Sequence, residues 1–183
     1  MKVSNRRRTL QSVLAEEPAI AIPDELERAF RAHHGLVFRT AYRITGNAAD
    51  AEDVLQTVFL RLLRRGPQAD ALENEESYLR RAAINAALDV IRSRQADRMV
   101  ELPDLPADPA RNDTSDLRRA LGRALAQLKP RSAEIFALRF LEGFSNPEIA
   151  RMLGISQVLV AVIVHRTRQQ LRKELGPNPG DSL

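Results

Sequence analysis

Apolar residues recur every three to four positions through most of this chain, and this is the period of amphipathic α-helices. The period predicts helices over residues 24–45, 47–65 and 74–98, and further helices between residues 115 and 143. Leu, Ala and Arg dominate the composition, and only 4% of the residues are aromatic. That composition also favours helices over sheets.

The clearest local pattern lies between residues 143 and 173. Ser145 and Glu148 form a capping box, and Pro147 sits in the first helical turn, where its missing N–H is not needed. Gly154 can adopt the left-handed conformation that ends this helix, and Ser156 can cap a second one. This pattern predicts a helix-turn-helix with a basic end, and a plain helical hairpin with a solvated basic tail is the alternative.

The helices group into two small domains of an all-α fold. Residues 24–98 are expected to form a three-helix domain, and residues 116–176 a four-helix, winged-helix-like domain that contains the helix-turn-helix. Residues 99–115 are acidic and contain three prolines, which predicts an extended linker, so the two domains need not touch. Residues 1–23 are expected to form a flexible arm and residues 177–183 a tail.

Composition limits the functional classes. A net charge of +4 and a sequence pI of about 10.1 fit a polyanionic partner. The chain has no cysteine and no secretory signal pattern, and its longest apolar run, 158–164, is too short to span a bilayer. We therefore expect a cytoplasmic protein without membrane insertion. Adjacent His33 and His34 diverge on a helix and cannot both bind one metal ion, so we expect no metal site. No Ser, His and Asp arrangement has a motif that suggests a nucleophile, so we expect no catalytic group, and we expect no cofactor.

Three segments of the chain resemble conserved parts of one protein family. Residues 50–61 read DAEDVLQTVFLR, residues 79–92 carry the basic side of a helix, and residues 138–166 run from LRFLEG through the helix-turn-helix. In this order and spacing they resemble bacterial sigma factors of the extracytoplasmic-function group. The resemblance implies an all-helical factor that binds core RNA polymerase and directs it to −10 and −35 promoter elements, without catalysing a reaction itself.

The resemblance implies that the helix over residues 47–65 docks on a coiled coil of the largest polymerase subunit. A face rich in carboxylates and an amide suits a charge-complementary, salt-sensitive contact of this kind. The side chains expected in this contact are Asp50, Glu52, Asp53, Gln56, Phe59 and Arg61.

In this family the −10 element is read by the next helix and by the loop before it, here residues 66–77. Basic side chains would hold the phosphates, and the loop would form a pocket for a base exposed by strand opening. The acidic linker would lie in the positively charged nucleic-acid channel of the polymerase. The side chains expected at the −10 element are Asn74, Ser77, Arg80, Arg81, Asn85, Asp89 and Arg92.

The −35 element is assigned by the resemblance to the second helix of the helix-turn-helix. The side chains expected there are Ser156, Gln157, Leu159, Ala161, Val162, His165, Arg166 and Arg168. The family usually has small polar and basic residues in this helix, whereas residues 158–164 are all apolar. Such a surface has almost no donors for bases or phosphates, which predicts weakened −35 binding. Two hypotheses explain the run. It binds a protein, such as an anti-sigma factor or another polymerase subunit, in addition to or instead of DNA, or it is buried against the preceding helices.

Two other functions fit the same sequence. One is a free-standing helix-turn-helix regulator that binds an operator without polymerase, with residues 24–98 as a dimerisation or sensing module. The other is a protein-interaction module that has lost promoter reading. For the sigma factor, the expected partners are core RNA polymerase, promoter DNA and an anti-sigma factor.

Overall fold

The computed structural model describes the backbone of residues 24–65, 74–100 and 113–175, and side chains over 24–65, 74–97 and 120–175. These residues form helices without strands, which confirms the all-α prediction and leaves no β-wing in the described part of the C-terminal domain. The predicted arm and tail, and most of the predicted linker and base-reading loop, lie outside the described residues.

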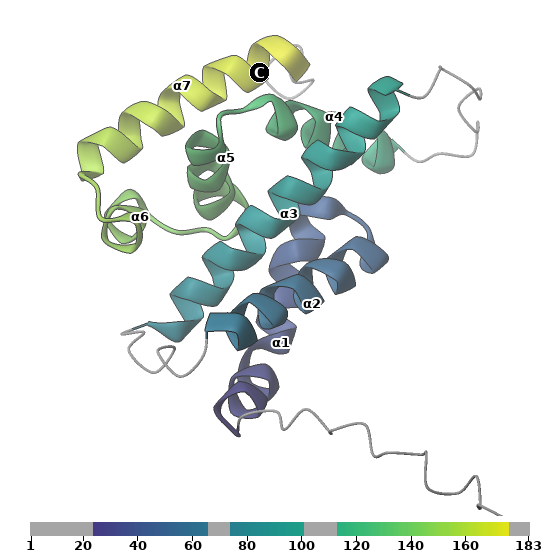
Figure 1. Cartoon of the computed structure of the whole chain (residues 1–183). Coiled ribbons are helices and arrows are strands. Elements are labelled where there is room, and N and C mark those ends of the chain that lie inside the picture. Colours follow the sequence, from purple (N-terminus) through teal and green to yellow (C-terminus); the bar gives the residue numbers. More distant parts are fainter. Residues whose placement is uncertain (1–23, 66–73, 101–112, 176–183) are drawn as a thin grey trace, which may run out of the picture.

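The N-terminal domain is a bundle of three helices, α1 (Asp24–Thr45), α2 (Ala48–Arg65) and α3 (Glu75–Val100). Each helix packs against the other two (Figure 1). The largest fully buried side chains of this bundle are Val37, Val54, Val58, Leu79, Ile84 and Leu88. Burial of one such aliphatic side chain contributes roughly 1.5–3 kcal/mol, so these rows of apolar residues hold the bundle together.

Short polar signals set the ends of these helices, close to the predicted positions. Gly46, with φ of 66°, ends α1. Asn47 caps α2 because its Oδ1 accepts a hydrogen bond of 3.2 Å from the backbone N–H of Asp50. Asn74 caps α3 in the same way, accepting a 2.8 Å hydrogen bond from the N–H of Ser77. These bonds satisfy donors that have no partner within the helix.

The C-terminal domain contains α4 (Asp113–Gln127), α5 (Pro130–Phe136), a π-helical turn η3 (Ala137–Leu141), α6 (Asn146–Leu153) and α7 (Gln157–Leu175). The first helix begins three residues before the predicted domain boundary, and the π-helical turn has no counterpart in the sequence prediction. The core of this domain contains the buried side chains Leu125, Leu128, Ile135, Leu138, Ile149 and Val160.

The predicted helix-turn-helix is confirmed in its local chemistry. The Glu148 carboxylate accepts hydrogen bonds from the backbone N–H of Ser145, at 2.7 Å, and from its hydroxyl, at 2.5 Å. The hydroxyl bond, followed by the backbone bond, lowers the pKa of Glu148 below its ordinary value of 4.5. Gly154 has φ of 62°, and Ser156 Oγ accepts a 3.2 Å hydrogen bond from the N–H of Leu159 at the start of α7. These contacts fix the turn between α6 and α7.

The two domains pack against each other along α3. This helix contacts α4 and α5 of the C-terminal domain as well as α1 and α2 of its own bundle (Figure 1). The η3 turn also contacts α1. The sequence predicts a linker that would let the two domains stay apart, and it does not predict that they touch. The structure shows that they are in contact.

No single described helix has the length and apolar character needed to cross a membrane. The pair α6 and α7 passes the same test of length and composition, but the two helices are bent by 111° at the turn that joins them.

Candidate protein and DNA interfaces

An exposed polar stripe runs along α2. Glu52, Asp53, Gln56 and Arg61 are all exposed, as the predicted polymerase contact requires. Leu60 is 51% exposed, and its spacing of seven residues from Asp53 places it on the same helical face. We did not predict Leu60 from the sequence, although this spacing was a usable signal. An apolar side chain surrounded by polar ones is typical of a protein interface.

Two residues predicted in this contact are buried instead. Asp50 is 5% exposed and forms an ion pair with Arg94 of α3. Phe59 is 8% exposed and packs edge-to-face on Phe30 of α1, with ring centroids 5.0 Å apart. Both side chains turn toward the neighbouring helices and away from the exposed stripe. The prediction that Asp50 lies on the outer side of this helix is therefore wrong, and the polymerase contact of Asp50 and Phe59 stays a prediction.

The burial of Asp50 leads to a test of its effect on stability. Burial raises the pKa of its carboxyl above the ordinary value of 3.8, although Arg94 opposes this. Because its pKa is raised, the Asp50 carboxyl binds its proton more tightly in the folded state than in the unfolded state. Protonated Asp50 therefore favours the folded state at low pH, and this contribution to stability is lost as the pH rises through the folded-state pKa. We expect Asp50→Asn, which cannot titrate, to gain stability relative to the native chain as the pH rises from 3.8. Urea unfolding at several pH values measures this; a constant difference would contradict it.

Five of the seven side chains predicted at the −10 element divide into two groups. Asp89 and Arg92 pair with each other at 3.3 Å on α3. Arg80, Arg81 and Asn85 face the C-terminal domain and bond to its carboxylates. In this arrangement Arg80, Arg81 and Asn85 are therefore already bonded to side chains of the C-terminal domain.

Asn74 and Ser77 lie in a cleft of about 500 Å³ between the two domains. The Asn74 side chain is engaged as the cap of α3, which gives it a structural role. The two walls of the cleft are formed by Asn74, Ser77, Tyr78 and Arg81 of the N-terminal domain and by Phe144, Glu148, Arg151 and Met152 of the C-terminal domain. The predicted base-reading side chains thus face α6.

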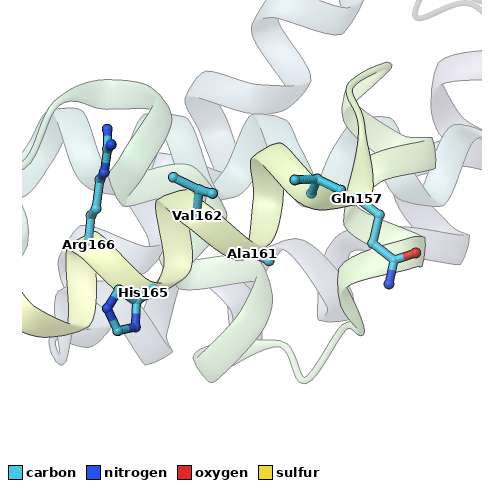
Figure 2. Close-up of a pocket in the computed structure, with 6 residues that line it drawn as sticks. Gln157, Ala161, Val162, His165 and Arg166 are labelled. Carbon is cyan, nitrogen blue, oxygen red and sulfur yellow. The ribbon is translucent and has the colours of Figure 1, made fainter.

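All eight side chains predicted at the −35 element are exposed. Several of them line an open, mostly apolar groove along α7 of about 620 Å³. Figure 2 shows five of these side chains projecting from successive turns of the helix: Gln157, Ala161, Val162, His165 and Arg166. The arrangement gives α7 a free surface, with basic and polar groups at its ends and methyl groups between them.

The burial hypothesis for residues 158–164 is correct for only part of the run. Val160 is fully buried, and Ile163 and Val164 pack partly against the core. Val158 is 73% exposed, and Leu159, Ala161 and Val162 are also exposed. The apolar character of this face is therefore not explained by the core. Val158, which we did not predict as a site residue, is its most exposed large apolar side chain.

Comparison with known proteins matches the N-terminal and the C-terminal helices to two regions of one protein family. Sigma-70 region 2 matches residues 29–97, and Sigma-70 region 4 matches residues 118–171. The RNA polymerase sigma-E factor of Streptomyces coelicolor is 32% identical over 82% of this chain and 86% of its own length. The sigma factor CarQ of Myxococcus xanthus is 35% identical over 84% of this chain and 90% of its own. The chain belongs to the extracytoplasmic-function sigma factors.

The sigma factor also resembles longer and structurally known members. It is 34% identical to the factor SigE of Mycolicibacterium smegmatis, over 91% of this chain but only 66% of that protein. The solved structure of the sigma factor RpoE from Bartonella quintana, in complex with the anti-sigma factor NepR, has a TM-score of 0.50 and 20% identity. That match covers 82% of this chain and 96% of RpoE, and it supports the same fold. The class of function is promoter-specific transcription initiation.

Proposed function

We propose that this sigma factor binds core RNA polymerase through the exposed stripe of α2, Glu52, Asp53, Gln56, Leu60 and Arg61. The observation that carries the proposal is the stripe itself, which combines carboxylates and an amide with an exposed leucine on one helix. Charged groups in such a contact guide association and orientation, and the apolar group supplies desolvation energy. The partner surface should accordingly be basic with an apolar pocket.

The two promoter elements are assigned to different helices. The N-terminal half of α3 would contact the −10 region through Arg80, Arg81 and Asn85, with Asp89 and Arg92 further along. The exposed face of α7 would contact the −35 region, with Gln157, His165, Arg166 and Arg168 as donors and Ala161 and Val162 available for thymine methyl groups. This division places nucleic-acid contacts on both domains.

An anti-sigma factor is a further proposed partner. The exposed side chains of Val158, Leu159 and Val162 favour it, because unpaired apolar groups on a helix surface are typical of protein contacts. The site of action would be the cytoplasm, where the polymerase works.

Run-off transcription with purified core polymerase tests the proposed function. We expect specific transcripts only when this chain is present, from promoters identified by sequencing the transcripts that rise when the chain is overproduced. Transcription that does not depend on the chain, combined with binding to duplex DNA alone, would indicate the free-standing regulator instead.

A further inference from the structure

The exposed side of α7 carries two grooves, and Ala161 and His165 line both of them. The apolar groove, of about 620 Å³, continues over Val158 and Val162 (Figure 2). The basic groove, of about 430 Å³, also reaches Asn146 at the start of α6. Its polar lining from α7 consists of His165, Arg168, Gln169 and Arg172. The exposed side of α7 is therefore apolar along one flank and basic along the other.

The charge of α7 indicates which kind of partner covers this surface. The helix contains one acidic residue, Glu174, and four basic ones, Arg166, Arg168, Arg172 and Lys173. Its first turn contains no acidic residue, and the backbone at a helix start carries a partial positive charge. A surface of this sign attracts a polyanion. The 111° bend between α6 and α7 also lies in the range of helix-turn-helix motifs, whose second helix enters the major groove.

The size of the apolar side chains also fits DNA better than protein. Val158, Ala161 and Val162 are short, so the backbone of α7 can approach the base edges closely. Protein contacts are anchored mainly by large side chains such as Trp, Tyr and Arg, and valine is under-represented among such anchors. Among the described residues that line the apolar groove, none is Phe, Tyr or Trp. The apolar flank is therefore suited to small apolar groups in the major groove.

The major groove displays one such group, the 5-methyl group of thymine. The helical rise places Val158 and Val162 about 6 Å apart along α7, whereas successive bases of one strand are about 3.4 Å apart. The three apolar side chains can therefore cover about two neighbouring base pairs. Arg166 lies at the end of the same groove, where it can bind a phosphate or a guanine.

We propose that Val158, Ala161 and Val162 make this sigma factor select −35 elements with neighbouring thymines, through contact with the thymine methyl groups. The inference rests on the proposed −35 role of α7 and names the chemical group that is read there. Apolar contact replaces the hydrogen bonds to base edges that this part of the helix cannot donate. Recognition of these bases then depends on a methyl group that takes no part in base pairing.

Promoters identified by run-off transcription supply the DNA for the test. Synthetic duplexes carry deoxyuridine in place of single thymines of the −35 element, which removes the methyl group and keeps the hydrogen-bonding groups of the base. Competition binding measures their affinity for the holoenzyme of this chain and core polymerase. We expect about fourfold weaker binding for each contacted methyl group that is removed. Deoxyuridine in the spacer between the two elements is the control and should leave the affinity unchanged.

A second pair of duplexes restores the methyl group on another base. At a thymine that responds to deoxyuridine, the base pair is changed to C·G, with either cytosine or 5-methylcytosine. We expect the duplex with 5-methylcytosine to bind about fourfold more tightly than the one with cytosine. Equal binding of the two would mean that deoxyuridine acted through the deformability of the duplex, and methyl recognition would be overturned.

Protein variants assign the effect to α7. Val162→Ala trims an exposed apolar side chain and should reduce the effect of deoxyuridine at one position from about fourfold to less than twofold. Val158→Ala should do the same at a neighbouring position. Leu175→Ala is the matched control, because Leu175 is as exposed as Val162, at 39%, but lies thirteen residues further along α7. It should keep the full effect. An unchanged effect in both valine variants would overturn the assignment.

The outcomes separate this inference from the proposed function. Transcription that depends on the chain, from −35 elements without thymine or insensitive to deoxyuridine, would overturn methyl recognition and leave the sigma factor function intact. The apolar flank of α7 would then be better explained by a protein partner. Absence of chain-dependent transcription would overturn the proposed function, and the inference with it.

Discussion

Asp53→Arg is expected to weaken the binding of core polymerase by about tenfold to a hundredfold at low salt. Asp53 is exposed in the middle of the α2 stripe, between Glu52 and Gln56. The reversal replaces an attractive charge with a repulsive one in the proposed contact with a basic surface. Titration of labelled core polymerase at low and high salt measures the loss, which should shrink at high salt because exposed charges are screened.

Two further variants locate the effect. Asp97→Arg makes the same change at an exposed position near the end of α3 and should leave polymerase binding within twofold of native. Leu60→Ala removes the apolar centre of the stripe, so its loss of affinity should depend much less on salt. Equal losses for Asp53→Arg and Asp97→Arg would show that net charge acts without a specific surface, and α2 would lose its assigned role.

Helix ends were predictable because their causes lie within a few residues. The capping box of Ser145 and Glu148, the left-handed Gly154 and the cap at Ser156 each involve neighbours on the chain. The same is true of Asn74 at the start of α3. Short-range chemistry of this kind does not depend on how the domains are arranged.

The docking residues were predicted less well, because exposure depends on which side of a helix meets its neighbours. Asp50 lies four residues before Val54 and eight before Val58, so it shares their buried row. The spacing alone could have indicated its burial. Its partner Arg94 is on another helix, however, and no local pattern connects the two residues.

Domain packing was the least predictable feature. Glu134 stands between Ala133 and Ile135, both fully buried, which suggests a buried carboxylate but does not identify its partners. Those partners, Arg81 and Asn85, belong to the other domain. The basic side of α3 suggested nucleic acid from the sequence, and the structure shows that a protein carboxylate can occupy the same groups.

Ala161→Lys combined with Val162→Arg is expected to strengthen binding to duplex DNA by about tenfold at low salt. Both positions are exposed on α7, beside the donors His165 and Arg166. Ile163 is unsuitable for this test because it packs partly against the core. Each new cation can neutralise one phosphate, so the slope of log affinity against log salt should steepen by up to about 1.8. Fluorescence anisotropy over a salt series measures both quantities.

Net charge alone would also raise non-specific DNA binding, so the control adds two cations elsewhere. Ala32→Lys with Ala49→Arg places them at exposed positions of α1 and α2, away from α3 and α7. If α7 enters the major groove, its variant should have the larger gain and the steeper slope, because its cations lie next to phosphates. Identical slopes for the two variants would mean that α7 does not face DNA. The exposed Val158, Leu159 and Val162 would then be better explained by a protein partner.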